Sequence, residues 1–405
     1  MSVEVLTTIS PTTNEPILTR NGISQADLDE LPNTATKAFE SWSKTSLADR
    51  QKIVKTALKL LLNLKDDLAQ ELTISDEVLK DTDGEAEKGF KRFIRKVPVG
   101  PVLVIFAWNY PYLILVNSLI PALLAGNTVI LKPSPQTPTI VERVAKVFEE
   151  AGLPSGVLQH FHCGSPTLIE SIVRNPKIKL VAFTGSVAGG LAIVDGAVFN
   201  SGQSCCSVER VYVADEIHDA FVEAVQKVLK GYVLGDPFDK GTHVGPVISK
   251  RSKETIEAHV QDAVAKGAKD ATPENESFAN PPPKGNFVKP TLLTGVDHSM
   301  TVMTEETFGP VIPVMRVKND DEAVKLMNDS EFGLTASIWT KDTDRGYAIA
   351  DQVEAGTVFV NRCDFPSPDL AWTGWKNSGK GQTLSRFGYD QFVKLKSYHL
   401  KDYPK

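Results

Sequence analysis

The chain has few cysteines, no surplus of basic residues and no long apolar run. Its 405 residues include four cysteines, too few for the disulfide scaffold of a small secreted protein. Lysine and arginine total 44 against 50 aspartates and glutamates, which gives a net charge of −6. A main partner that is nucleic acid or an acidic membrane normally requires a basic face. We therefore expect a globular protein of the reducing cytoplasm with neither partner.

The longest apolar stretch, residues 110–126, is interrupted by Pro111, Asn117, Ser118 and Pro121. It falls short of the ~20 apolar residues that a membrane span needs, so it predicts a buried helix. The first residues have neither the basic region of a secretory signal nor the arginine-rich pattern of a transit peptide.

No Gly-x-Gly-x-x-Gly fingerprint follows any predicted strand, and the seven histidines are scattered. His160 and His162 alternate along a predicted strand just before Cys163. A metal site would need a further ligand that is not visible, so an alternating strand is the favoured interpretation and no metal is predicted.

Short β-rich runs alternate with helix-length segments between residues 97 and 186. The strands are predicted at 102–106, 128–131, 158–161 and 180–183, and the helices at 112–125, 137–151 and 166–174. Such alternation predicts a parallel sheet covered on both faces, with ligands at the carboxyl ends of its strands. Asn109, Lys132 and the pair Gly185-Ser186 follow strand ends.

A second α/β region is predicted after residue 196. Its strands are expected at 210–213, 291–293, 312–315, 335–339 and 357–360, and its helices at 215–230, 249–267, 320–328 and 342–354. The Pro-, Gly- and Asn-rich residues 273–285 predict a surface loop. Residues 91–98 and 395–402 are charged and β-prone at the periphery.

Two adjacent cysteines, Cys205 and Cys206, follow a Gly-Gln turn that is expected to join a short apolar helix to a β-branched strand. A thiol at the end of an element, beside backbone N–H groups without partners, has its thiolate stabilised. This position favours a nucleophile. The alternative is a packed free thiol, since unpaired cysteine is often buried.

Five segments occur in an order that resembles the aldehyde dehydrogenase superfamily. They are 106–111 (Phe-Ala-Trp-Asn-Tyr-Pro), 131–138 (Leu-Lys-Pro-Ser-Pro-Gln-Thr-Pro), 181–186 (Val-Ala-Phe-Thr-Gly-Ser), 202–205 (Gly-Gln-Ser-Cys) and 305–310 (Glu-Glu-Thr-Phe-Gly-Pro). The resemblance implies an α/β fold with a Rossmann-type parallel-sheet cofactor domain, an α/β catalytic domain and a small oligomerisation flap. The domains would be 1–194 (with 88–102 in the flap), 195–382 and the C-terminal return and oligomerisation tail 383–405, in a homodimer or homotetramer.

The resemblance also implies roles for single residues in the NAD(P)+-dependent oxidation of an aldehyde to a carboxylic acid. Cys205 would be the nucleophile that forms the thiohemiacetal and thioester, and Asn109 would hold the oxyanion together with the Cys205 backbone N–H. A neutral amide suits that role because it donates without adding a charge. Asn109 would otherwise only cap the following helix.

The same resemblance assigns cofactor contacts. Lys132 would bond the adenosine ribose, Ser186 after Gly185 the pyrophosphate and Glu306 the nicotinamide ribose, while Phe308 would pack near the nicotinamide. Trp108 and Ser134 stand beside these positions and complete the predicted cofactor set. Many NAD-preferring members carry a glutamate three residues after the lysine, where this chain has Pro135, so the choice between NAD and NADP stays open.

One expected part is missing. Gly185 and Cys205 are twenty positions apart, whereas the family places there a helix, a strand and a Glu-Leu-Gly-Gly turn, a shortfall of roughly 30 residues. The lost glutamate is the family's general base. Glu209, Asp195 and Glu305 are possible substitutes, although nothing in the sequence aims them at the site. A second shortfall lies between residues 71 and 77.

This gap leaves alternatives open: a truncated or spliced variant of an active enzyme, an inactive or deacylation-defective relative, and an acylating or reductive dehydrogenase that needs no base. The loss of a strand is also expected to leave a sheet edge unpaired. Tyr112, Phe365 and Trp372 suggest an apolar or aromatic substrate only weakly, because core packing explains them equally well.

Overall fold

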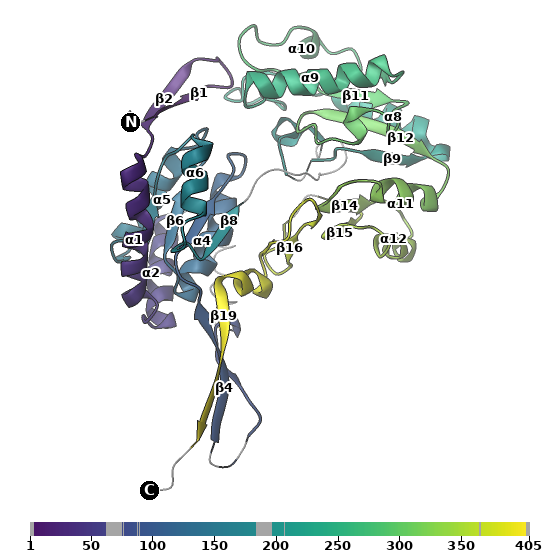
Figure 1. Cartoon of the computed structure of the whole chain (residues 1–405). Coiled ribbons are helices and arrows are strands. Elements are labelled where there is room, and N and C mark those ends of the chain that lie inside the picture. The colour runs from purple at the N-terminus through teal and green to yellow at the C-terminus, as the bar shows by residue number, and fades with distance from the viewer. Residues whose placement is uncertain are drawn as a thin grey trace.

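The computed structural model describes residues 4–61, 75, 77–86, 88, 90–183, 197–205, 207–363 and 366–401. Figure 1 shows two α/β lobes side by side and a long ribbon that projects away from them. In this part of the chain, no helix is both long and apolar enough to cross a membrane.

The first lobe is built on a four-stranded parallel sheet of order β7-β6-β5-β8. The strands are β7 (Leu158–His160), β6 (Val129–Lys132), β5 (Val102–Ile105) and β8 (Leu180–Phe183). The predicted strands are therefore correct to within one residue at each end. β6 is buried along its whole length, as expected for a parallel strand covered on both faces.

The helices of this lobe that the structure describes from end to end are α1 (Gln25–Trp42), α2 (Leu47–Leu60), α4 (Pro111–Ala125), α5 (Thr139–Glu150) and α6 (Pro166–Val173). α4 is the predicted buried helix, and every residue from Leu119 to Ala125 is buried. It begins at Pro111, which needs no N–H partner there, and ends at left-handed Gly126. The C-terminal return η4 (Arg386–Phe392) packs Tyr389 and Phe392 into the same core.

The second lobe has a four-stranded sheet of order β10-β11-β12-β9. Its strands are β10 (Lys269–Asp270), β11 (Thr291–Thr294), β12 (Val311–Val317) and β9 (Val211–Ala214), with helices α8 (His218–Lys230) and α9 (Lys250–Ala265). The predicted loop 273–285 contains a short helix, α10 (Glu276–Ala279), because Phe278 is buried in the core of this lobe.

The remaining predicted strands, β14 (Thr335–Ile338) and β15 (Thr357–Val360), form a separate parallel pair. They accompany α11 (Asp320–Asn328) and α12 (Thr343–Ala350). Among the described residues, β14 pairs with β15 alone and β9 pairs with β12 alone. The second α/β region is thus interrupted between β9 and β14.

The ribbon consists of β19 (Val393–Lys401) and β4 (Phe90–Pro98), paired antiparallel over nine residues, with β3 (Thr82–Asp83) beside β4. Phe93 stacks on Tyr398 with ring centroids 4.6 Å apart.

The remaining strands are short. They are the hairpin β1 (Val5–Ile9) and β2 (Pro16–Asn21), and the two-residue strands β13 (Phe332–Gly333), β16 (Trp372–Thr373), β17 (Trp375–Lys376) and β18 (Gln382–Thr383).

Candidate functional site

The loop before Cys205 has an unusual backbone. Three consecutive residues, Asn200, Ser201 and Gly202, have φ angles of 51°, 60° and 72°. These values lie in the left-handed region, which favours glycine. Residues 197–198 are helical and the 3₁₀ segment η1 (Phe199–Gly202) follows them, while the residues before 197, where the rest of the predicted short apolar helix would lie, are outside the described residues. Gly202 also packs closely against the backbone of Gly309. A Cβ atom added to Gly202 would lie 2.2 Å from the Gly309 carbonyl carbon.

Hydrogen bonds fix this loop from a second side. Ser201 Oγ donates to the Gly245 carbonyl at 2.8 Å, and Gln203 Oε1 accepts from the Ile248 N–H at 2.7 Å. The Gln203 side chain is 3% exposed. The glutamine of the Gly-Gln pair is therefore an anchor for the cysteine loop, a role that the sequence pattern alone did not indicate.

Cys205 is partly exposed, whereas Cys163 and Cys363 are buried, and all three are free thiols. Cys206 lies outside the described residues. The partial exposure of Cys205 agrees with the expectation that this thiol is not buried, and a partly exposed thiol on a fixed loop suits a nucleophile.

Asn109 lies beside this loop, although it comes from the first lobe. Its Nδ2 atom donates to the Gln203 carbonyl at 3.5 Å, a long contact, and its buried Oδ1 atom accepts no hydrogen bond. The capping alternative is wrong, because the N-cap of α4 is Tyr110 and α4 has no side-chain cap. The amide retains the capacity to donate to a developing oxyanion close to Cys205.

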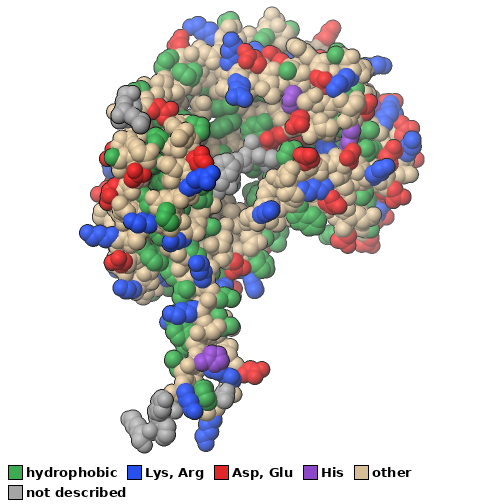
Figure 2. Space-filling model, in the orientation of Figure 1, with side chains coloured by type: hydrophobic (Ala, Val, Ile, Leu, Met, Phe, Trp, Pro, Cys, Tyr) green, Lys and Arg blue, Asp and Glu red, His purple; other side chains and the backbone are tan. Residues whose placement is uncertain are grey.

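The predicted cofactor residues Trp108 and Phe308 meet across the two lobes. Their rings make an edge contact with centroids 6.2 Å apart. Phe308 has a φ of 50°, and Glu306 beside it is partly buried. Figure 2 shows the molecular surface hollowed between the lobes.

Lys132 ends β6 and is 7% exposed. Burial lowers the pKa of its ammonium group, and no described carboxylate forms an ion pair with it. A buried amine with free donors at the carboxyl end of a parallel strand fits a hydroxyl-rich or phosphorylated ligand, so the residues present fit a dinucleotide. Ser134 occupies the following turn, where its Oγ accepts from the Gln136 N–H. Gly185 and Ser186 lie outside the described residues.

The carboxylates considered as replacements for the general base differ in burial and in hydrogen bonding. Glu209 directs both carboxylate oxygens to backbone N–H groups: Oε2 accepts from Thr307 and Oε1 from Phe308, each at 2.9 Å. Burial raises the pKa of Glu209 to about 7, against the lowering effect of these two N–H donors, and the charge of Glu306 adds to the rise. Glu305 is exposed, and Asp195 lies outside the described residues.

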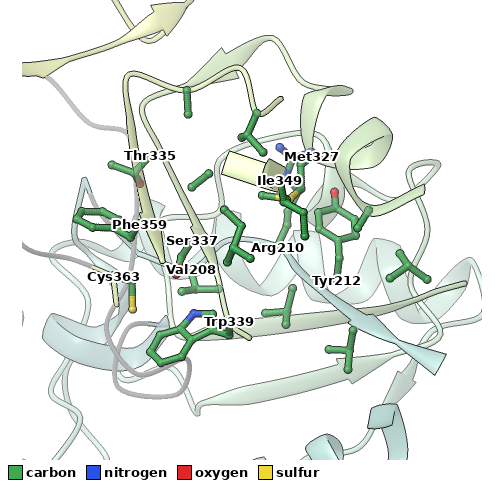
Figure 3. A pocket seen from close by; sticks show the side chains of 18 of the residues that line it. Val208, Arg210, Tyr212, Met327, Thr335, Ser337, Trp339, Ile349, Phe359 and Cys363 are labelled. Atoms are coloured by element: carbon green, nitrogen blue, oxygen red, sulfur yellow. The ribbon is translucent and has the colours of Figure 1, made fainter. Parts of the chain in front are cut away.

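A cavity of about 1060 Å³ separates β9 from β14. Figure 3 shows side chains around it from the β9 side, the β14 side and the neighbouring helices, namely Val208, Arg210, Tyr212, Thr335, Ser337, Trp339, Met327 and Ile349. The cavity therefore lies between two strand edges that have no partner strand in the described part of the chain. An unpaired strand edge is the consequence expected from a lost strand.

The histidine pair does not form a metal site with its neighbours. His160 and His162 are 5.8 Å apart between ring centroids, and His162 Nε2 lies 3.1 Å from Glu142 Oε1. No group of three or more His, Cys, Asp or Glu side chains in the described ranges is arranged to hold a metal ion.

The aromatic residues considered for a substrate tunnel are dispersed. The Tyr112 hydroxyl accepts from Arg143 at 3.3 Å and its ring packs on the first-lobe core, while Trp372 lies in β16 and Phe365 is outside the described residues. They give no indication of the substrate.

Comparison with known proteins identifies the family. The family model described as the aldehyde dehydrogenase family matches residues 2–87, 72–194 and 190–398. The chain is 29% identical to the NADP+-dependent succinate-semialdehyde dehydrogenase of Deinococcus radiodurans, over 96% of this chain and 93% of the relative. It is 30% identical to the NADP+-dependent D-glyceraldehyde dehydrogenase of Picrophilus torridus, over 98% and 93%.

Solved structures agree. The NAD+ complex of betaine aldehyde dehydrogenase from Staphylococcus aureus superposes with a TM-score of 0.88 at 27% identity, covering 99% of this chain and 92% of that chain. The expected fold is confirmed, and the relatives' use of NADP+, NAD(P)+ or NAD+ confirms the predicted cofactor class.

The breaks in the family match coincide with the two predicted shortfalls, near residues 72–87 and 190–194. The alignment with the Picrophilus torridus relative runs over 469 positions, whereas the chain has 405 residues, so at least 64 aligned positions have no counterpart here. Motifs, fold and relatives agree despite this loss: the chain belongs to the aldehyde dehydrogenase family, and the prediction of an NAD(P)+-dependent aldehyde oxidoreductase is confirmed at that level.

Proposed function

We propose that Cys205 and Asn109 of this chain oxidise an aldehyde with NAD(P)+ through a thioester, and that release of the acid is the slow step. The observation that carries the proposal is the contact between the Asn109 amide of one lobe and the Gln203 carbonyl of the other. This contact supports the proposal because Gln203 is two residues before the partly exposed thiol of Cys205.

The chemistry follows from these two groups. The Cys205 thiolate attacks the carbonyl carbon, so a C–S bond forms and the carbonyl electron pair moves to oxygen as a thiohemiacetal. Asn109 Nδ2 and the Cys205 N–H would stabilise that oxygen, an effect typically worth about 10²- to 10³-fold in rate per donor. A bound NAD(P)+ would supply the hydride acceptor. Loss of hydride from the thiohemiacetal carbon re-forms the C=O bond and leaves a thioester on Cys205.

Lys132, Ser134, Gly185 and Ser186 would hold the adenosine and pyrophosphate side of the cofactor, and Glu306, Phe308 and Trp108 the nicotinamide side. The buried Lys132 amine and the Trp108–Phe308 contact support this assignment. Because Pro135 replaces a carboxylate in the ribose-binding turn, we propose that NAD+ and NADP+ are both accepted.

Hydrolysis of the thioester needs a base to activate water, which typically contributes about 10²- to 10⁴-fold. The resemblance places that base in the segment that this chain lacks, and the split family match supports the loss. Glu209 does not replace it, since both its oxygens are engaged by Thr307 and Phe308. Transfer of the acyl group to an acceptor that carries its own thiol needs no such base, so a thiol acceptor would release the acyl group from Cys205.

Further parts of the proposal concern organisation. We propose a cofactor domain of residues 1–194, a catalytic domain of 195–382 and a C-terminal return of 383–405, supported by the separate sheets of the two lobes. The ribbon, with 88–102 and the tail, would join subunits of a homodimer or homotetramer, since Leu395 and Leu400 are exposed on it. The three described free cysteines support a reducing cytoplasm.

The test is a rapid-mixing experiment with a panel of aldehydes and either NAD+ or NADP+, following the absorbance of the reduced cofactor. The expected result is a burst of at most one equivalent per site followed by slow turnover. Cys205→Ala should abolish the burst and Cys206→Ala should leave it. Absence of any burst would refute the enzyme proposal, and loss of the burst in Cys206→Ala alone would refute the choice of nucleophile.

A further inference from the structure

Glu209 makes an unusual connection between distant segments. It stands just before β9, yet its carboxylate binds the backbone N–H groups of Thr307 and Phe308, 98 and 99 positions away along the chain. A single side chain thus satisfies two consecutive main-chain donors. Hydrogen bonds to an ionised acceptor are stronger than neutral ones.

The segment that Glu209 binds has a strained backbone. Phe308 is a bulky residue with φ of 50°, a conformation that must be imposed by its surroundings. Thr307 is 5% exposed, and its Oγ1 lies 3.2 Å from His259 Nδ1 of α9. Without the Glu209 carboxylate, two backbone N–H groups in this packed region would lose their acceptors, which is costly.

We propose that Glu209 is a positioning residue for the cofactor: its carboxylate fixes the 306–308 turn so that Glu306 and Phe308 face the nicotinamide side of the site. The inference rests on the proposed function, because it assigns that side of the site to Glu306 and Phe308. Phe308 is already in edge contact with Trp108 from the first lobe, so the turn links the cysteine loop, the cofactor and the lobe interface.

We call the pair of hydrogen bonds from the Thr307 and Phe308 N–H groups to the Glu209 carboxylate the Glu209 clamp. This clamp depends on ionisation of the carboxyl group. A carboxylate accepts both N–H groups, whereas a protonated carboxyl carries a hydrogen on one oxygen and can serve only one of them fully. The charged neighbours are few: Glu306 repels the carboxylate, His259 contacts Thr307 from α9, and Arg210 turns to the Met303 and Asp329 carbonyls. Since the pKa of Glu209 is about 7, the clamp loosens as the pH falls below neutrality.

The experiment compares the wild-type chain with Glu209→Gln and with Glu305→Gln, a neighbouring exposed carboxylate that does not bind the turn. Amide hydrogen exchange of the 304–310 segment is measured without cofactor at pH 6 and pH 8, corrected for intrinsic exchange. Binding of NAD+ alone is then measured by calorimetry at both pH values. NAD+ serves as the probe because NADP+ carries an additional phosphate that titrates in this range.

We expect Glu209→Gln to lose protection of the 304–310 segment and to bind NAD+ about tenfold more weakly at pH 8, the equivalent of one charge-assisted hydrogen bond. The affinity of the wild type for NAD+ should fall between pH 8 and pH 6. The affinity of Glu209→Gln should change little over this range, and that of Glu305→Gln should fall as in the wild type.

Reduced protection with unchanged NAD+ affinity would overturn the positioning role, and unchanged protection would overturn the clamp itself. If the wild type binds no NAD+, the proposed function fails and this inference fails with it. The exchange data would then still show whether Glu209 orders the turn, so the two failures are distinguishable.

Discussion

At the scale of single residues, the loop that carries the proposed nucleophile contains a glycine with no room for a side chain. Gly202 has φ of 72° and faces the Gly309 backbone, so Gly202→Ala should displace the Cys205 loop and abolish the burst of reduced cofactor. Gly241→Ala is the matched control, since a Cβ atom there meets nothing within 4 Å. A normal burst from Gly202→Ala would show that the loop geometry is not required.

The buried carboxylate predicts a pH dependence of stability. The pKa of Glu209 rises from 4.5 to about 7 on folding, so the folded state holds the proton more tightly than the unfolded state. The resulting stabilisation is present below pH 4.5 and is lost as the pH rises through 7.

Denaturant unfolding at pH 5, 6, 7 and 8 measures this effect. The free energy of unfolding of the wild type should fall over this range relative to that of Glu209→Gln, in which the group no longer titrates. Parallel pH profiles for the two proteins would contradict the account.

Sequence reasoning at this scale succeeded where a residue lies next to its own motif. Cys205 was expected to be accessible because it follows a turn, and it is. The roles of Gln203 and Glu209 were missed because their partners, Ile248 and Phe308, lie about 50 to 100 positions away. An acidic residue immediately before a buried β-branched strand was the available signal, since such a group is costly to bury without a partner.

At the scale of elements, the interrupted sheet between β9 and β14 is the main departure from an intact fold. Strand positions were predictable from β-branched runs, and β8 and β15 were found at their predicted ends. The loss of a strand was predictable from the motif spacing. The motif spacing did not predict which strand edges would be left open, because strand order depends on contacts between distant segments.

Restoring the segment should therefore stabilise the chain. A chimaera that inserts, at residues 190–194, the segment carried there by the Picrophilus torridus relative should fill the cavity between β9 and β14. Each large apolar side chain newly buried contributes roughly 1.5–3 kcal/mol, so the thermal midpoint should rise by several degrees in calorimetry. An insertion of equal length but glycine- and serine-rich is the control. Equal midpoints for both insertions would contradict the assignment of the cavity to a lost strand.

The ribbon gives a separate prediction at this scale. Leu395 and Leu400 on β19 are 69% and 47% exposed, and exposed apolar side chains on a projecting ribbon are typical of a contact surface. Replacing both with glutamate should convert an oligomer into a smaller species by light scattering, with little change in far-ultraviolet circular dichroism. Replacement of the exposed Val228 and Val264 by glutamate, away from the ribbon, is the control and should leave the mass unchanged. An unaltered mass for the ribbon variant would remove the ribbon from the subunit contact.

At the scale of the whole molecule, the two lobes bring together the groups that we propose begin the reaction, while the segment that the family resemblance assigns to its completion is missing. Asn109 and Trp108 come from the first lobe and meet Gln203 and Phe308 of the second. The overall fold was predictable because five motifs occur in the family's order. The stage at which catalysis would stop depends on a residue that is not in the chain.

Intact-protein mass spectrometry after mixing the chain with an aldehyde and NAD(P)+ tests this most directly. We expect a covalent acyl adduct on Cys205 that forms with the burst, is absent in Cys205→Ala, persists in water and disappears when a small thiol acceptor is added. Continuous formation of reduced cofactor without any accumulated adduct would show that deacylation is fast, and would contradict the central claim.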